Sequence, residues 1–285
     1  MATPIKNLFM HKVASEEVLD ILLEQVEFAV QMTCQSCVDA VEKALKETEG
    51  VQSVSVNLAQ EQVVVESTLT SFQIQEILEN TGRRAVLKGQ GSKATHLGAA
   101  VSVLETSARV KGVVRLTQVD ENTCVIEGTI DGLMPGEHGL AIHEYGDISD
   151  GCNSCGGHFN PHGVEHGGPS QPRRHVGDLG NITAAENGRA RFRIEDDQLK
   201  VWDVIGRSCM VHENPDDLGK GSTPQSHTDG NSGAGLACGI IARSAGLFEN
   251  TKKICACDGV TLWDERDVPA AGPGRQQHSS YQSNL

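Results

Sequence analysis

The sequence is poor in aromatic residues, in basic residues and in long apolar runs. Aromatic residues make up 4% of the 285 residues, whereas glycine occurs 31 times, which indicates a loop-rich β domain. Lysine and arginine number 24 against 38 acidic residues, so the formal net charge is -14. This charge argues against a nucleic-acid partner, because phosphate binding needs a basic surface. No apolar run approaches the roughly 20 residues that a membrane-spanning helix needs, so we predict no membrane span.

The first 23 residues lack the features of a targeting segment. They hold two lysines, scattered acids and short apolar runs, and they resemble neither a secretion signal nor an Arg-rich transit peptide. We therefore expect residues 1–23 to be a poorly ordered extension and the protein to be cytoplasmic. In a reducing compartment, nine cysteines are more typical of metal binding or redox chemistry than of structural disulfides.

A length of 285 residues suggests two or more domains, and the first is expected over residues 24–92. Alternation of apolar and polar residues predicts four strands: Gln25–Gln31, Val51–Leu58, Val63–Ser67 and Arg84–Lys88. Apolar residues at helical spacing predict helices over Cys37–Glu47 and Ser71–Glu79. The order βαββαβ is that of a ferredoxin-like fold. The Gly/Ser/Lys stretch Lys88–His96 is expected to be a linker.

A second domain is expected over residues 96–243, where short alternating segments are separated by glycine-rich turns. The predicted strands are Gly98–Leu104, Lys111–Gln118, Thr123–Asp131, Gly139–Glu144, Ala190–Glu195, Cys209–Val211 and Ala237–Arg243. This spacing predicts an antiparallel barrel or sandwich. The segment Gly146–Asp178 has no periodicity, and so long a loop needs something to hold it in place. Residues 244–285 are too short and polar to form a core, so we expect an irregular tail there.

The first cysteine pair occurs in the sequence Met-Thr-Cys-Gln-Ser-Cys, at the entry to the first predicted helix. Cys37 is close to the helix N-terminus, where unpaired N–H groups favour a thiolate. Two thiolates at the spacing of Cys34 and Cys37 can hold one ion, and such a site suits Cu(I). The alternative is a thioredoxin-type redox pair, but that motif would follow a strand in a βαβ unit of a different topology. In its βαββαβ frame, the motif resembles the heavy-metal-associated domain of copper chaperones, which implies that Met32 packs beneath the loop.

A second pair, Cys255 and Cys257, lies in the predicted tail and is separated by a single residue. On an extended segment the two side chains point the same way, so both sulfurs can bind one copper ion. The pair could also form a strained disulfide or attack another disulfide. Copper binding and thiol transfer are both predicted for these two residues.

The middle of the chain closely resembles Cu/Zn superoxide dismutase. The resemblance depends on the motif His-Gly-Leu-Ala-Ile-His-Glu-Tyr-Gly-Asp, on His-Val-Gly-Asp-Leu-Gly-Asn, on Val-His-Glu, and on Leu-Ala-Cys-Gly, in that order. It implies a Greek-key β-barrel with a zinc site. The implied zinc ligands are His158, His166, His175 and Asp178. Three imidazoles with one carboxylate form a closed Zn(II) site of the structural kind, which would hold the long loop in place.

The same resemblance implies a disulfide between Cys152 and Cys238, although Cys152 and Cys155 form a C-x-x-C that offers a competing pair. Cys124 and Cys209 fall within predicted strands and are expected to be buried. The tail and the two domains together are similar to the family of copper chaperones for superoxide dismutase.

The copper site of the enzyme is incomplete in this sequence. His143, His158 and His212 match three of the four copper ligands, and Ala141 stands where the family has the fourth. An arginine that orients superoxide in the enzyme is replaced by Gly235, whereas the family's outer-shell aspartate is kept as Asp216. We therefore expect residual copper affinity at most and no efficient dismutation.

The family resemblance implies a copper chaperone that is not an enzyme. It would deliver Cu(I) to copper-free Cu/Zn superoxide dismutase and promote formation of the disulfide of its target. The implied partner is a dismutase subunit, bound as a heterodimer through Ala237–Arg243 and the Tyr145–Gly151 loop, and a homodimer is also possible. The alternatives are a dismutase with an attached copper-loading domain, which Ala141 and Gly235 argue against, and a metal-free thiol–disulfide oxidoreductase.

Overall fold

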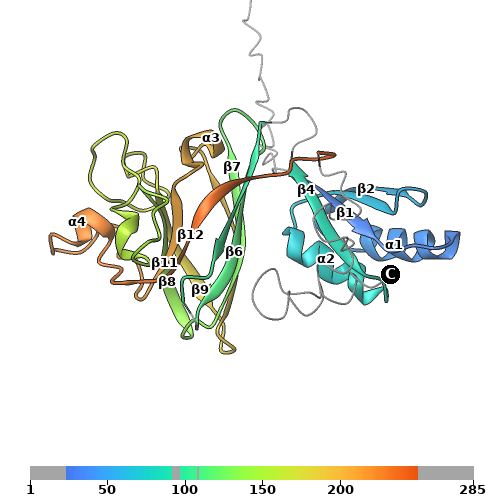
Figure 1. Ribbon diagram of the computed structural model, residues 1–285, viewed down its shortest axis with the longest axis horizontal. Coiled ribbons are helices and arrows are strands. Elements are labelled where there is room, and N and C mark those ends of the chain that lie inside the picture. The colour runs from blue at the N-terminus through green and yellow to red at the C-terminus, as the bar shows by residue number, and fades with distance from the viewer. Residues whose placement is uncertain (1–23, 92–96, 108, 250–285) are drawn as a thin grey trace, which may run out of the picture.

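The computed structural model describes residues 24–91, 97–107 and 109–249, which form two domains that lie side by side (Figure 1). A four-stranded sheet with two long helices precedes a closed barrel. The expected N-terminal extension, residues 1–23, lies outside the described residues. The tail cysteines Cys255 and Cys257 also lie outside them.

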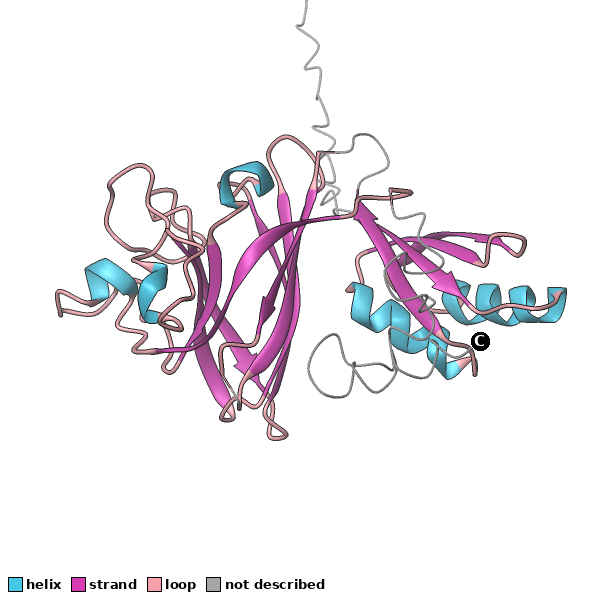
Figure 2. Cartoon of the chain, in the orientation of Figure 1, coloured by secondary structure: helices cyan, strands magenta, loops and turns pink. Residues whose placement is uncertain are grey.

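The first domain has the predicted βαββαβ order. Its elements are β1 (Glu24–Val30), α1 (Gln35–Lys46), β2 (Val51–Asn57), β3 (Gln62–Ser67), α2 (Ser71–Asn80) and β4 (Ala85–Gly91). The antiparallel sheet has the order β2-β3-β1-β4, and the two helices cover one of its faces (Figure 2). The linker expected over Lys88–His96 is wrong in its first part. Strand β4 continues to Gly91, which pairs with Gln25, because the edge of β1 supplies backbone partners that a Gly/Ser/Lys composition does not reveal.

The core of this domain forms between the sheet and the apolar faces of the helices. Val38, Val41 and Leu45 repeat at helical spacing along α1 and are buried. Helix α2 begins with a capping box, in which the Thr70 side chain accepts from the Gln73 backbone and the Gln73 side chain accepts from the Thr70 backbone. The helices therefore lie on the sheet in a fixed orientation, and α1 presents its N-terminus at the end of β1.

The second domain is the expected antiparallel Greek-key barrel. Its strands are β5 (Ala99–Leu104), β6 (Lys111–Gln118), β7 (Cys124–Asp131), β8 (Gly136–His143), β9 (Asp178–Ala184), β10 (Arg189–Asp196), β11 (Ser208–His212) and β12 (Gly235–Ser244). They close in the order β10-β7-β6-β5-β12-β11-β8-β9. Three short helices, η1 (Asn153–Cys155), α3 (Val201–Val204) and α4 (Ser226–Asp229), lie in the connections.

Strand β9 is absent from the sequence-based prediction, which has all seven other strands. Gly180 and Asn181 interrupt its short apolar pattern, and its first residue, Asp178, reads as the end of the metal-type loop. Pairing with β8 and β10 decides its conformation, because the barrel closes only when both neighbours gain backbone partners.

A buried polar contact joins the two domains. The carboxylate of Glu127 on β7 accepts hydrogen bonds from the Ser71 backbone N–H, at 2.9 Å, and from Gln90 Nε2, at 2.7 Å. Glu24 on β1 and Arg193 on β10 form a second link at 2.9 Å. Glu24 and Glu127 are almost fully buried, and Oε1 of Glu24 has no hydrogen-bond partner among the described residues. Burial, followed by the proximity of Glu127, raises the pKa of Glu24 to about 7, because an ionised carboxylate is costly away from water.

The segment that follows β12 returns to the first domain. The Phe248 backbone N–H donates to Glu27 Oε2 at 2.6 Å, and Leu247 is buried against Gly91. A Cβ atom added at Gly89 would lie 2.1 Å from the Gly246 carbonyl oxygen, so only glycine allows this close approach. The start of the expected tail is thus attached to the domain that carries Cys34 and Cys37.

Candidate metal sites

The first cysteine pair lies where the loop after β1 enters α1, with Cys37 in the first turn of the helix. Cys34 is the N-cap residue of α1, and its Sγ lies 3.5 Å from that of Cys37. Met32 is buried in the core of the domain beneath the loop, as predicted. Two sulfurs at this separation, accessible from solvent and without a nearby third cysteine among the described residues, suit a soft ion with low coordination number.

The environment of Cys37 favours its thiolate. Hydrogen bonds from the Thr33 backbone, from the Arg83 side chain and from Cys34 lower the pKa of the Cys37 thiol to about 6. Arg83 precedes β4 and is held in place by a 2.6 Å hydrogen bond to the Thr81 carbonyl oxygen. Arg83 is not recognisable from the sequence as a neighbour of Cys37, because residues separated by 46 positions share no local pattern.

We expect Arg83→Ala to raise the pKa of Cys37, because the variant loses a cationic hydrogen-bond donor to the thiolate. The midpoint of pH-dependent alkylation at Cys37 should move upward from about 6 by roughly one pH unit. Site-resolved mass spectrometry after brief alkylation measures this midpoint. Arg83→Lys keeps a cation and should show a smaller change; identical midpoints in the native chain and Arg83→Ala would disprove this role.

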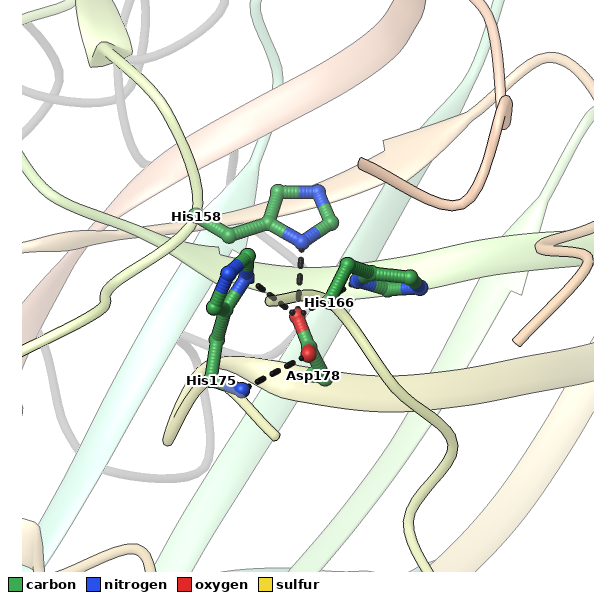
Figure 3. Close-up of side chains that lie close together, drawn as sticks. All are labelled: His158, His166, His175 and Asp178. Carbon is green, nitrogen blue, oxygen red and sulfur yellow. Dashed lines mark hydrogen bonds and ion pairs between the residues drawn. The ribbon is translucent and has the colours of Figure 1, made fainter. Parts of the chain in front are cut away.

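The four predicted zinc ligands come together in the barrel (Figure 3). Nδ1 of His158, of His166 and of His175 lies 2.8, 2.9 and 3.1 Å, respectively, from a single oxygen, Oδ1 of Asp178. The three histidines are supplied by the long connection between β8 and β9, and Asp178 begins β9. All four side chains are buried.

The surroundings of this cluster orient its nitrogen atoms. His166 Nε2 lies 2.8 Å from Asp216 Oδ1, and His175 Nε2 lies 2.9 Å from the Val164 carbonyl oxygen. These outer contacts leave Nδ1 of His166 and of His175 facing the centre of the cluster, as metal-ligating histidines do, whereas Nε2 of His158 has no hydrogen-bond partner in the described part of the chain. Burial opposes ionisation of Asp178, but hydrogen bonds from the three histidines lower its pKa below the usual range. The residues fit Zn(II), because a closed set of three imidazoles and one carboxylate is complete.

Arg174 secures the loop beside the predicted zinc ligands. It is almost fully buried, and its Nη1 donates to the carbonyl oxygens of His175 and Asp178 at 2.9 and 3.1 Å. Its Nη2 binds Asp196 on β10 at 2.5 Å. The sequence gives no sign of this role beyond the position of Arg174 next to a ligand, so its contribution became visible only in the folded chain.

A second histidine cluster lies next to the predicted zinc ligands and shares His158 with them. His143 Nε2 and His212 Nε2 are 3.1 Å apart, and the ligand atoms of all three histidines lie within 4.8 Å of one another. Burial, followed by the proximity of His158, lowers the pKa of His143 to about 3 and that of His212 to about 4. Both rings are therefore neutral at pH 7, and their Nε2 atoms are available to a metal ion.

Ala141 provides no fourth ligand to this cluster. It lies two residues before His143 on β8, opposite Asp178 and Met210, and is buried. Leu140 and Ile142 instead belong to the barrel core. Residues 141 and 143 therefore share the other face of the strand, and a methyl group occupies the position from which a ligand would reach the cluster.

The remaining described cysteines separate into two groups. Cys124 and Cys209 are buried in strands, as predicted, and burial raises the pKa of Cys209 to about 12. Cys152 and Cys238 are free thiols whose side chains are hydrogen-bonded to each other, and Cys155 packs against them. The structure brings the two predicted disulfide partners together, and their pairing stays a prediction.

Comparison with known proteins gives separate matches for the two domains. Residues 27–84 match the heavy-metal-associated domain family, and residues 110–241 match the copper/zinc superoxide dismutase family. Superoxide dismutase [Cu-Zn] A of Xenopus laevis is 50% identical over 145 residues, which are 50% of this chain and 95% of that protein. The crystal structure of the clock protein EA4 is similar with a TM-score of 0.50 and 42% identity, over 52% of this chain and 96% of that one.

Other relatives are similar across both domains. The copper chaperone for superoxide dismutase of Mus musculus is 59% identical over 261 residues, which are 91% of this chain and 95% of that protein. The Homo sapiens protein of the same name has the same identity and coverage. Within the described residues, no helix has the length and apolar character needed to cross a membrane.

The identity to these relatives is 59% and extends over 91% of this chain, which includes both domains. The chain therefore belongs to the family of copper chaperones for superoxide dismutase.

Proposed function

We propose that this chain carries Cu(I) on Cys34 and Cys37 and delivers it to copper-free Cu/Zn superoxide dismutase in the cytoplasm. The observation that carries the proposal is the contrast between two sites. An accessible pair of sulfurs lies 3.5 Å apart in the first domain, while the copper position of the barrel has Ala141 in place of a ligand. The chain keeps a loading site and lacks a complete catalytic one.

Transfer between thiolates suits a cargo ion. The low pKa of Cys37 keeps its sulfur ionised at neutral pH without a buried environment, so the ion can be approached by a further sulfur ligand. Entry of that ligand before departure of the first keeps Cu(I) coordinated throughout. Cys255 and Cys257 are proposed as the next pair of sulfurs, and the attachment of Phe248 to Glu27 keeps the start of their segment at the first domain.

Zn(II) is proposed to hold the barrel rather than to react. His158, His166, His175 and Asp178 fill its four coordination positions, so no position is left for substrate. The ion would fix the long connection between β8 and β9. A fixed connection in turn positions the exposed loop at residues 145–151 beside the barrel strands.

The partner surface is proposed to be an apolar patch on the barrel. The patch consists of Val103, Tyr145, Ile148, Ile205 and Ile240, whose exposed fractions range from 38% to 52%. Val103 and Ile240 lie on the neighbouring strands β5 and β12, and Tyr145 is tied to β11 through its carbonyl oxygen, which accepts from Ser208 Oγ at 2.7 Å. Large apolar side chains gathered on one face favour a protein partner. We assign the patch to a dismutase subunit in a heterodimer, and a homodimer is the competing occupant.

The tail is also proposed to promote the disulfide of the target. A disulfide between Cys255 and Cys257 would be attacked by a target thiolate, which forms a mixed disulfide and releases one tail thiolate. The second target thiolate then displaces the tail. Two target thiols are thereby oxidised to a disulfide, and the tail pair is reduced to two thiols. Within the barrel itself, Cys152 and Cys238 are the proposed disulfide partners.

Activation of copper-free dismutase tests the function. Copper-loaded native chain should restore activity to the reduced, zinc-loaded target, whereas Cys255→Ser with Cys257→Ser should restore less than about one tenth of it, because the variant lacks both tail sulfurs. Cys209→Ser, at a buried barrel thiol, is the matched control. Equal activation by the native chain and the tail variant would reject the role of the tail. Size-exclusion chromatography with light scattering separates a heterodimer from a homodimer.

A histidine at position 141 should strengthen the residual copper site. We expect Ala141→His to raise the copper affinity of the barrel by roughly 10–100-fold, because it adds a ligand to an oriented set of imidazoles. Competition titration with the thiol pairs alkylated measures this affinity, and Ala141→Asn, which adds a polar side chain without an imidazole, is the control. Gly235→Arg would also disturb the packing of the barrel, since a Cβ atom at residue 235 would lie 2.5 Å from Met210 Sδ. Unchanged affinity in Ala141→His would show that the missing ligand is not the limiting defect.

A further inference from the structure

A cluster of three cysteines lies apart from the metal sites, under the exposed loop of the barrel. Cys152, Cys155 and Cys238 pack together with Met210. Cys155 and Cys238 are fully buried, whereas Cys152 is half-buried. A barrel disulfide needs two cysteines, so the third sulfur has no role in the function proposed above.

Hydrogen bonds hold each of the three cysteines in place. Thr106 Oγ1 lies 3.5 Å from the sulfurs of both Cys152 and Cys238, and it accepts from the Cys238 backbone N–H at 2.9 Å. Cys155 Sγ lies 3.4 Å from the Asp147 carbonyl oxygen. The Cys155 backbone N–H donates to the Cys152 carbonyl oxygen at 3.4 Å, so the two residues belong to one tight turn, η1.

The local electrostatics distinguish Cys152 from Cys238. A hydrogen bond from Cys238 lowers the pKa of the Cys152 thiol to about 7, and the same contact raises the pKa of Cys238. Burial instead raises the pKa of Cys209, on the same barrel, to about 12. Cys152 has two cysteine neighbours in the cluster: Cys238 on β12, and Cys155 in the turn that Cys152 begins.

We propose that Cys155 is an internal nucleophile that exchanges a Cys152–Cys238 disulfide for a Cys152–Cys155 disulfide. The inference rests on the Cys152–Cys238 pairing proposed above. The Cys155 thiolate attacks Cys152 Sγ, a new S–S bond forms, and the bond to Cys238 breaks. Cys238 leaves as a thiolate and takes up the proton that Cys155 lost. No electrons enter or leave the protein, so the step needs no external oxidant or reductant.

Whether the barrel is folded or unfolded decides which disulfide is favoured. In an unfolded chain, closing the short ring from 152 to 155 is favoured over closing the ring to 238 by on the order of 100-fold. In the folded barrel, the Thr106 contact holds Cys152 and Cys238 together and favours the long ring. The exchange therefore couples disulfide pairing to the folding of the loop.

The exchange also acts on the apolar patch. Tyr145 and Ile148 precede Cys152 on the loop, and Ile240 follows Cys238 on β12. The Cys152–Cys238 bond joins these two parts of the patch covalently, whereas the Cys152–Cys155 bond leaves them joined by non-covalent contacts alone. The pairing thus sets how firmly the docking surface is held.

Disulfide mapping of the full-length protein tests the exchange. The chain is equilibrated in glutathione buffers of several ratios of disulfide to thiol, quenched with acid, alkylated and digested. Both pairs should be found, and their ratio should stay constant while the oxidised total rises, because both pairs have lost the same two electrons. In urea, the ratio of Cys152–Cys155 to Cys152–Cys238 should rise to on the order of 100 to 1.

Cys155→Ser and Cys209→Ser are the matched variants. Cys155→Ser should retain only the Cys152–Cys238 pair, and it should slow amide exchange of residues 145–151 relative to the native chain; Cys209→Ser should behave as the native chain does. Detection of Cys152–Cys238 alone, with Cys155 alkylated in every buffer and in urea, would overturn the exchange. Failure of Cys238 to form any disulfide would instead overturn the pairing on which the exchange rests.

Discussion

Asp178→Asn is expected to abolish zinc-dependent stabilisation of the barrel. Asp178 Oδ1 lies within 3.1 Å of three imidazole nitrogens, and its Oδ2 accepts from the backbone N–H groups of Gly167 and His175 at 3.0 and 2.9 Å. An amide removes the charge that compensates a bound cation, so the variant should lose about 3–5 kcal/mol of unfolding free energy in the presence of zinc. Zinc analysis of the purified protein and thermal unfolding with and without a chelator measure the effect.

The contribution of bound zinc to the free energy of unfolding can be separated from a general loss of packing. Saturating zinc at 1,000 times its dissociation constant should stabilise the native chain by about 4 kcal/mol relative to chelated protein. The variant should show no such difference. Asp150→Asn, at an exposed carboxylate of the same loop, should change stability by less than about 0.5 kcal/mol. One zinc ion retained per Asp178→Asn chain would refute the assignment.

Cys34→Ser with Cys37→Ser is expected to remove tight Cu(I) binding from the first domain. The two sulfurs are the only cysteine ligands that the described part of that domain offers, and a serine hydroxyl is a hard, protonated group that Cu(I) does not favour. The affinity should fall by more than about 100-fold, since changes to outer contacts alone cost 10–100-fold. Anaerobic competition against a strong Cu(I) chelator measures it, in a Cys255→Ser, Cys257→Ser background that isolates the first pair.

Ser36→Ala is the matched control for this pair. Its hydroxyl lies 3.0 Å from Cys34 Sγ, so the variant perturbs the loop without removing a sulfur, and its affinity should stay within about tenfold of the native value. X-ray absorption of the loaded native chain should show sulfur neighbours. A cuprous centre surrounded by imidazole nitrogen, with both thiol pairs free to react, would contradict the proposed function as a whole.

Sequence periodicity predicted the elements that pack against a core, and it failed where partners decide the structure. The alternation of Lys111–Gln118 matches β6 residue for residue, since every second side chain faces the barrel interior. Strand β9 and the last residues of β4 have no comparable pattern. Their strand conformation depends on backbone hydrogen bonds to β8, β10 and β1, which sequence spacing does not encode.

The candidate metal-site residues could be proposed from their types and order, whereas the neighbours that influence them could not. Arg83 is 46 residues from the thiol that it influences, and Arg174 binds Asp196 on β10, 22 residues away in the sequence. Both are arginines in unremarkable polar surroundings of the sequence. Only folding places one guanidinium at a thiolate and the other among carbonyl oxygens.

The sequence by itself determined the chemical character of each site: paired sulfurs for a soft, exchangeable ion, and imidazoles with one carboxylate for a structural ion. That character depends on side-chain type, which the fold cannot alter. The tertiary structure decided which of these side chains come together. It brought the nitrogen atoms of three loop histidines to one oxygen of Asp178, packed a third sulfur against Cys152 and Cys238, and returned Phe248 to Glu27. These contacts join residues distant in sequence, so they depend on strand order and barrel closure rather than on local pattern.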